Sequence, residues 1–373
     1  MNKKYNYESE YYWDSPYIEL YPPARAELQQ QPRSVTQRDH LRRMGDSEFN
    51  VDAFIKSEMG RAVADLITGY PVTDSDENPA ADAYWNARGY KREYHKANDP
   101  AHDWVSLVPK DARPGELFPT VVLIHGGQAQ GLASGMETSG YIHEIIKRDR
   151  AVFILPANAE TPNTIRACDE AEEVLPIDKS RMYIIGFSGG AAWARYTALT
   201  NVDRFAAYAP NGSHMMSWPT LISDEQLVEI RRKGLPVCIY AGLNEFLKIF
   251  PLNRKCDKFM GIMGKDEQPG IPDEKYMLFR RCLYASGCED INLTECYKSA
   301  EDENPARRMC AVPGGDARIE TICGFRHAVI DFKRQSGDLG MRVICVEGMP
   351  HVVAPSACAL VWDMLRRHKR EGR

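Results

Sequence analysis

A single serine lies among glycines in the stretch "RMYIIGFSGGAAWARY", residues 181 to 196. An apolar run precedes Ser188, and small residues at the start of a helical pattern follow it. A serine hydroxyl is a weak nucleophile unless it is exposed and lies next to a base. A sharp turn from strand to helix exposes it, and Gly186 and Gly190 leave room where the backbone of such a turn is crowded. The pattern G-x-S-x-G therefore predicts a nucleophilic Ser188, and an ordinary Gly/Ser turn is the alternative.

A second glycine turn occurs earlier, in "VVLIHGGQAQG". Acyl transfer needs two backbone N–H groups that stabilise the developing oxyanion. One comes from the residue after the nucleophile, Gly189, and the other from the loop after an earlier strand. We expect the second to be the amide of Gly127, with Gln128 beside it, and we expect a structural role for His125. A phosphate-binding turn is the alternative, although the chain has no G-x-G-x-x-G or Walker pattern.

The base that activates the serine should be a histidine on a loop after the last strand. His351, in "VICVEGMPHVVAP", follows an apolar run and precedes the last helical pattern, so we predict that it is the base. The alternatives are His327, His214 and His368, of which His368 is expected on an exposed charged tail.

A carboxylate is also needed, because it orients the histidine and stabilises its charged form. We predict Glu245, which follows the apolar run of "PVCIYAGLNEFL". The chain order is then Ser188, Glu245, His351, that is nucleophile, acid and base. The rival carboxylates are Asp224, Asp331 and Asp338.

Strands and helices must position these groups, and their pattern is clear in the second half of the chain. Continuous apolar runs separated by helical stretches indicate a mostly parallel sheet with helices on both faces, which is an α/β fold. The last helix lies within 356–370. Two further strands, "GYKREYHK" and "DWVSLVPK", are joined by a turn. The apolar runs are 120–125, 151–157, 181–187, 205–210, 236–242 and 342–348.

The remaining segments do not show this alternation of apolar runs and helical stretches. Residues 1–45 lack periodicity and are predicted to be an extended arm, whereas 46–70 has apolar residues at helical spacing and is predicted to be one amphipathic helix. The segment 246–335 is expected to be an insertion over one end of the sheet, and it is a candidate cap or lid. The predicted units are an N-terminal extension (1–88), a core (89–245 and 336–373) and this insertion (246–335).

Composition limits the class of protein. The chain has 373 residues, 43% of them hydrophobic, and a formal net charge of −5. No basic stripe occurs, which argues against a nucleic-acid partner. No apolar run approaches the roughly 18 residues of a membrane span. The N-terminal stretch lacks the apolar centre of a secretory signal, so a complete native chain is expected in the cytoplasm, and a chain trimmed of its signal would look the same.

Ten cysteines are present, and no pair has C-x-x-C spacing. We therefore do not expect a zinc site. Four cysteines in apolar segments are expected to be buried, namely Cys168, Cys238, Cys345 and Cys358. The other six cluster within Cys256–Cys323 and are expected to be free thiols in a reducing compartment, with disulfides only in an exported protein.

These motifs resemble those of the α/β-hydrolase superfamily, and more narrowly esterases of the polyhydroxybutyrate depolymerase and feruloyl esterase kind. The resemblance rests on "DWVSLVPKDARPGELFPTVVLIHGG", "LPIDKSRMYIIGFSGGAAWARY" and "GMPHVV", and it covers roughly 100–245 and 340–370. It implies an α/β-hydrolase fold and serine-dependent hydrolysis of a carboxylic ester, without metal or organic cofactor. By motif, the resemblance implies catalytic roles for Ser188, His351 and the amides of Gly127 and Gly189. At the acid position such proteins commonly have aspartate, whereas this chain has Glu245.

Three functional hypotheses follow. The first is an esterase acting on a small-molecule or polymer-derived ester, the second is a serine peptidase of the same fold, and the third is a catalytically silent binding protein. A homo-oligomer formed through the N-terminal arm is a further hypothesis. The loop "NGSHMMSWP" follows the strand beside Ser188, and it is either part of the substrate pocket or an apolar surface loop. Its pocket candidates are His214, Met215, Met216 and Trp218.

Overall fold

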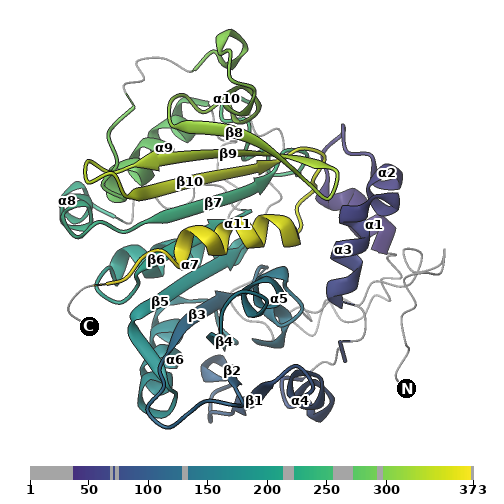
Figure 1. Cartoon of the computed structure of the whole chain (residues 1–373), viewed down its shortest axis with the longest axis vertical. Helices are drawn as coiled ribbons and strands as arrows, with labels where there is room; N and C mark the ends of the chain where they lie inside the picture. Colours follow the sequence, from purple (N-terminus) through teal and green to yellow (C-terminus); the bar gives the residue numbers. More distant parts are fainter. Residues whose placement is uncertain are drawn as a thin grey trace.

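One mixed sheet organises the chain in the computed structural model (Figure 1). The strand order is β1-β2-β4-β3-β5-β6-β7-β10-β9-β8. The strands are β1 (Tyr90–His95), β2 (Trp104–Pro109), β3 (Phe118–Ile124), β4 (Val152–Pro156), β5 (Ile177–Phe187), β6 (Ala207–Asn211), β7 (Val237–Gly242), β8 (Asp316–Ile322), β9 (Phe325–Lys333) and β10 (Leu339–Val346). The structure describes residues 37–67, 70–71, 75–127, 133–212, 222–254, 272–291 and 297–370.

The centre of the sheet is parallel and its edges are antiparallel. Strands β4, β3, β5, β6, β7 and β10 run in the same direction. On one side β2 and β1 are antiparallel, and on the other side β9 and β8 are antiparallel. The six apolar runs and the two further strands predicted from the sequence are confirmed, and so is the α/β fold class.

Helices cover both faces of the sheet, as continuous apolar strands require. In β3, Val122 and Ile124 point into a core shared with α6 and α7, whereas Val121 and Leu123 point into a second core shared with α5 and α11. The α-helices are α1 (Gln37–Met44), α2 (Val51–Lys56), α3 (Glu58–Ile67), α4 (Pro79–Asn86), α5 (Gly140–Ile146), α6 (Thr161–Val174), α7 (Gly189–Thr200), α8 (Asp224–Lys233), α9 (Pro272–Ala285), α10 (Pro305–Cys310) and α11 (Pro355–Leu365).

The N-terminal segment differs from its prediction in two ways. Residues expected within an extended arm form α1, and the expected single helix is two helices, α2 and α3. Ser57 separates them, because its backbone N–H ends α2 on the carbonyl of Phe54 and its hydroxyl accepts the N–H of Gly60 in α3. A serine that caps a helix start competes with continuation of the preceding helix. Residues 1–36 lie outside the described part of the chain.

The segment 246–335 does more than lie over one end of the sheet. Its last third forms β8 and β9, which extend the sheet beyond β10. Strand β9 has a buried run, Ala328–Ile330, which pairs with β10, whereas β8 is an edge strand in which every residue is half-buried or exposed. A polar edge strand lacks the apolar pattern on which the sequence prediction depended. The predicted domain boundaries and the lid remain predictions.

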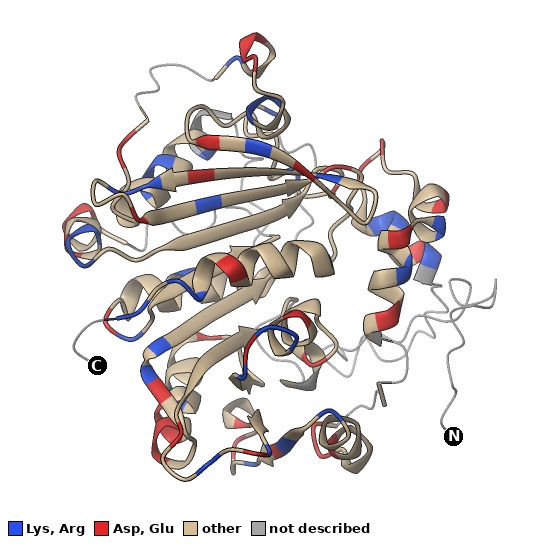
Figure 2. Cartoon of the chain, in the orientation of Figure 1, with Lys and Arg blue, Asp and Glu red and all other residues tan. Residues whose placement is uncertain are grey.

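Charge and cysteine placement agree with a packed α/β molecule. Figure 2 shows acidic and basic residues interspersed along the outer helices, while the central strands are mostly uncharged. Eight cysteines are described and all eight are free thiols, including the four predicted to be buried. Cys256 and Cys296 lie outside the described residues. In the described ranges there is no cluster of side chains that could hold a metal ion, and no helix has both the length and the apolar character needed to cross a bilayer.

Candidate active site

Ser188 lies at the turn between β5 and α7 in a strained backbone conformation. Its φ is +56° and its ψ is −125°, a region that residues with a side chain rarely adopt. Such strain persists only where the surroundings enforce it, and it is concentrated at functional sites. Two hydrogen bonds hold the turn: the N–H of Ser188 donates to the carbonyl of Asn211 at 2.9 Å, and its own carbonyl accepts from Ala191 at 3.0 Å. The side chain of Ser188 is half-buried.

Glycines make this turn possible, as predicted. A Cβ at Gly186 would lie 2.1 Å from the carbonyl oxygen of Gly190. A Cβ at Gly190 would lie 2.2 Å from the carbonyl oxygen of His125 and 2.4 Å from that of Ile124. Strand β5, helix α7 and the turn after β3 therefore meet backbone to backbone.

Replacing Gly190 with alanine should destabilise the protein strongly. The added methyl group would overlap two backbone carbonyls that cannot rotate away, so α7 must separate from the turn after β3. We expect a loss of about 3 kcal/mol in the free energy of unfolding, measured by urea denaturation. Gly337→Ala is the control, because a Cβ there meets nothing within 4 Å and only its φ of +90° is unfavourable. Equal losses in the two variants would contradict this account of the turn.

The two predicted oxyanion donors are neighbours beside Ser188. A Cβ at Gly126 would lie 3.1 Å from the Cβ and 3.8 Å from the Oγ of Ser188. A Cβ at Gly189 would lie 2.3 Å from the carbonyl oxygen and 3.3 Å from the nitrogen of Gly127. Gly189 is the first residue of α7, so its N–H has no partner within the helix. Gln128, the third predicted residue, lies outside the described residues.

His125 anchors the loop that carries Gly127. Its imidazole is buried, with Nε2 3.0 Å from the carbonyl oxygen of Ala157 and Nδ1 3.0 Å from that of Gly126. The contact to Ala157 joins the end of β3 to the end of β4. Both contacts agree with the structural role that we expected for His125.

The predicted base and acid form a buried pair. His351 Nδ1 lies 2.9 Å from Glu245 Oε2, and the two side chains are 5% and 1% exposed. The imidazole stacks on the ring of Phe187 at 4.7 Å between centroids, and the ring of Phe246 meets it edge to face at 5.1 Å. The ring orientation of His351 is therefore fixed by one hydrogen bond and two aromatic contacts. Neither Phe187 nor Phe246 was predicted to be part of the site. A lone phenylalanine next to a motif gives no signal in the sequence.

Burial raises the pKa of the Glu245 carboxyl above its usual value. The hydrogen bond from His351, the positive charge that His351 can carry and the ammonium of Lys275 act in the opposite direction, but they are smaller. A carboxylate in such a place stabilises a positive charge on the imidazole more strongly than a solvated one. Glu245 lies in such a place, and its role as the acid remains a prediction.

No hydrogen bond joins His351 to Ser188 in this structure. His351 Nε2 is buried and has no hydrogen-bond partner among the described residues. The two residues nevertheless lie at the same end of the sheet, because β5, β7 and β10 are parallel and each residue follows the carboxyl end of its strand. Phe187, the residue before Ser188, touches the imidazole. Catalytic hydrogen bonds are often long or misaligned before substrate binds.

Asn211 is a further residue that the sequence analysis missed. It ends β6 beside β5, and its carbonyl holds the N–H of Ser188. Its buried side chain donates to the hydroxyl of Tyr141 at 2.6 Å and accepts from the N–H of Tyr240 at 2.8 Å. Asn211 therefore fixes the position of the Ser188 turn relative to β7. Polarity at the end of an apolar run, in "FAAYAPNGS", is the one signal that was available.

The rival residues lie elsewhere, each with other partners. Among the rival carboxylates, Asp224 pairs with Arg281, Asp331 pairs with Arg342, and Asp338 accepts from Ser336. Among the rival histidines, His327 is bonded to Ser356, and His214 lies outside the described residues. His368 is half-buried and not on an exposed tail, and burial lowers its pKa to about 4.

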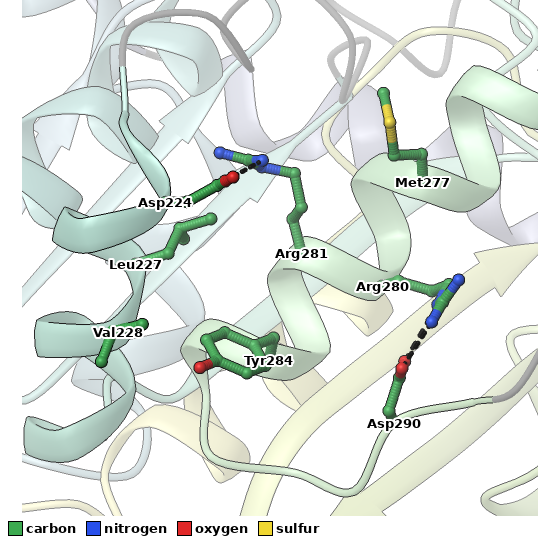
Figure 3. A pocket seen from close by; sticks show the side chains of 8 residues that line it. All are labelled: Asp224, Leu227, Val228, Met277, Arg280, Arg281, Tyr284 and Asp290. Carbon is green, nitrogen blue, oxygen red and sulfur yellow. Dashed lines mark hydrogen bonds and ion pairs between the residues drawn. The ribbon is translucent and has the colours of Figure 1, made fainter.

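The residues predicted for the substrate pocket lie outside the described residues, and they are His214, Met215, Met216 and Trp218. A cavity of about 300 Å³ lies between α8 and α9 (Figure 3). Two arginine–carboxylate pairs, Arg281–Asp224 and Arg280–Asp290, flank its apolar floor. Asp224, a rival candidate for the acid, lines this cavity, but Ser188, Glu245 and His351 do not. The lining residues are Asp224, Leu227, Val228, Met277, Arg280, Arg281, Tyr284 and Asp290.

Comparisons with known proteins find similarity only among solved structures. No family model matches the chain, and no curated protein matches it. One similar structure is the S-formylglutathione hydrolase of Staphylococcus aureus, at 14% identity over 41% of this chain and 79% of that chain, with a TM-score of 0.34. A second is a mutant feruloyl esterase module from Clostridium thermocellum complexed with sinapinate, at 13% identity over 43% and 70%, with a TM-score of 0.34. A third is an acylaminoacyl peptidase of Pyrococcus horikoshii, at 13% identity over 43% and 33%, with a TM-score of 0.29.

Proposed function

We propose that this chain, which has the α/β-hydrolase fold, is a serine hydrolase that cleaves a carboxylic ester through an acyl-enzyme intermediate. One observation carries the proposal: a buried His351–Glu245 pair lies at the same end of the sheet as a strained serine turn, and the imidazole touches the residue before that serine. A nucleophile, a base and a group that orients the base are the minimum set for this chemistry.

In the first step, Ser188 Oγ attacks the ester carbonyl carbon and its proton passes to His351 Nε2. Glu245 holds the other imidazole nitrogen and stabilises the positive charge that forms. The amides of Gly127 and Gly189 bind the oxyanion of the tetrahedral intermediate. When the carbon–oxygen bond to the alcohol breaks, the alcohol leaves with the proton from His351 Nε2, and the acyl group stays on Ser188.

In the second step, water replaces the alcohol. His351 Nε2 takes a proton from the water as its oxygen attacks the acyl carbonyl, and it returns that proton to Ser188 Oγ when the acyl–serine bond breaks. The products are a carboxylic acid and the free enzyme. Only protons move between His351, serine, water and alcohol, so the residues named complete the cycle.

A fluorophosphonate probe tests the proposal directly, because it reacts with a serine that is activated by a base. We expect the purified chain to be labelled at Ser188, as located by peptide mass spectrometry, and to hydrolyse acyl p-nitrophenyl esters faster than short peptide amides. His351→Asn is the control and should abolish labelling. Labelling with faster cleavage of peptides would favour the peptidase hypothesis instead. A folded chain that is not labelled would favour the silent binding protein and overturn the proposal.

A further inference from the structure

The N-terminal segment crosses the two loops that carry Glu245 and His351. Residues Met44–Asp46, which we call the strap, begin at the last residue of α1 and lie beside the carboxyl ends of β7 and β10 (Figure 1). The sequence analysis placed this stretch where an extended arm meets an amphipathic helix and gave it no part in the site. In the structure it contacts the loops that carry the predicted acid and base.

The carbonyl of Met44 binds both loops at once. It accepts the N–H of His351 at 2.8 Å and the N–H of Phe246 at 3.3 Å. His351 belongs to the loop after β10, and Phe246 is the residue after Glu245 in the loop after β7. A single oxygen therefore sets the spacing between the backbones of the predicted base and acid.

The other two strap residues extend this contact along the loop after β7, which carries Glu245 and which we call the acid loop. Gly45 forms an isolated antiparallel bridge with Glu245, and the N–H of Asp46 donates to the carbonyl of Asn244 at 2.8 Å. The Asn244 side chain continues the link, because its amide lies 3.4 Å from the Asp46 carboxylate and its oxygen accepts the N–H of Gly348 at 3.0 Å. Gly348 precedes His351 by three residues, so this link also spans both loops.

A buried ion pair joins the strap to the turn that begins at Glu245. The carboxylate of Asp46 pairs with the ammonium of Lys248, and the side chains are 3% and 12% exposed. The N–H of Lys248 donates to the carbonyl of Glu245 at 3.2 Å, so Lys248 ends the turn that begins at Glu245. Its φ is +49°, which is unfavourable for a residue with a side chain. The Asp46 carboxylate therefore holds the end of a strained turn whose first residue is the predicted acid.

The strap is itself anchored on both sides. Before it, Leu41 in α1 is buried, and after it, Phe54 in α2 is buried against Phe325 with ring centroids 6.2 Å apart. These residues belong to the same core as α11. The acid loop is also held from its other side, where Lys275 in α9 donates to the carbonyls of Lys248 and Arg254.

We propose that Asp46 is a positioning residue for the hydrolase site, acting through Lys248 and the strap to hold Glu245 against His351. This inference rests on the proposed function, which it deepens by adding an N-terminal element to the site. Asp46 touches no substrate in this account. A small displacement of catalytic groups by a residue that does not react can lower a rate about a hundred-fold.

Asp46→Asn tests this with little change in shape, because the amide keeps one acceptor oxygen and removes the charge that pairs with Lys248. We expect kcat for a p-nitrophenyl ester to fall about ten- to a hundred-fold, with KM changed less than about three-fold. Lys248→Met should give a similar fall, and the double variant should be no worse than either single variant, because both lose the same pair. Glu48→Gln is the matched control: this exposed carboxylate is in the same segment and lies 3.6 Å from Arg254, and its loss should leave kcat unchanged.

A readout that does not need turnover separates this inference from the proposed function. The proton on His351 Nδ1, held by Glu245, should give a downfield NMR resonance that disappears in His351→Asn. We expect Asp46→Asn to weaken or shift this resonance and Glu48→Gln to leave it in place. An unchanged resonance together with unchanged kcat would overturn the role of Asp46. A lower melting temperature with the resonance and kcat both intact would reduce Asp46 to a stabilising residue and would also overturn it. A wild-type chain without esterase activity, whose resonance still responds to Asp46→Asn, would overturn the proposed function alone.

Discussion

Replacing Ser188 with alanine should lower kcat for ester hydrolysis by at least about 10⁴-fold and abolish labelling by a fluorophosphonate. The hydroxyl oxygen is the atom that forms the bond to the acyl carbon in the proposed mechanism, and no other group can take its place. Residual catalysis would come from the two amides beside the turn and from substrate binding.

The fold should survive this substitution. Ser188 is half-buried, and the hydrogen bonds that hold its turn run through its backbone, which alanine retains. The melting temperature measured by circular dichroism should therefore stay within a few degrees of wild type. Ser180→Ala is the control, because this serine lies in the same strand, β5, with its hydroxyl on Asp178. Turnover of p-nitrophenyl acetate by folded Ser188→Ala at the wild-type rate would refute the mechanism.

Replacing Glu245 with glutamine should lower kcat by about 10² to 10⁴-fold while the pocket around it stays the same. Glutamine has nearly the shape of glutamate, and its amide oxygen can accept the hydrogen bond from His351 Nδ1. It carries no charge, so it cannot stabilise the imidazolium that forms when Ser188 loses its proton. The measurement is kcat for the same ester at pH 7 to 8.

The same variant should gain stability at neutral pH. Burial raises the pKa of the Glu245 carboxyl in the folded chain above its unfolded value, so the folded chain binds this proton more tightly. The stability that this group contributes is then complete below the unfolded pKa, near 4.5, and is lost as pH rises through the raised folded pKa. Glutamine does not ionise and avoids that loss. We expect Glu245→Gln to unfold at a higher temperature than wild type at pH 7 to 8, with the gap closing as pH falls toward 4.5.

A matched control separates this effect from a general effect of charge. Glu347 is the first residue of the loop after β10, which carries His351. Its side chain is 45% exposed and pairs with Arg326 on the surface. Glu347→Gln should change neither kcat nor the pH dependence of unfolding by a measurable amount. If Glu245→Gln kept full activity, or if it were less stable than wild type at pH 8, the assignment of Glu245 as the buried acid would fail.

The strap gives the N-terminal part of the chain a role that differs from a simple arm. An element that precedes the first strand of the sheet contacts the loops after β7 and β10. The predicted site is therefore built from both ends of the chain. The homo-oligomer expected from residues 1–45 remains a prediction.

Local sequence patterns were sufficient for much of this molecule. The parallel strands were predictable because strands buried on both faces are continuous apolar runs. The turn at Ser188 was predictable because only glycine fits where an added Cβ would lie 2.1 to 2.4 Å from a carbonyl oxygen, and both glycines are visible in the sequence. The candidates Glu245 and His351 followed from their places after apolar runs predicted to be strands and from the chain order nucleophile, acid and base.

Tertiary structure decided the rest, because the remaining contacts join residues far apart in the chain. The strap contacts residues about 200 and about 300 positions away through backbone atoms, and backbone hydrogen bonds leave no trace in residue identity. Phe187 and Phe246 became neighbours of the imidazole only when β5, β7 and β10 were brought together. Strand β8 is next to β9 in the chain as well as in the sheet, but it is a polar edge strand, so it was recognisable only through that pairing. Residue type and spacing determined which groups could react, and the long-range backbone contacts determined how those groups are held.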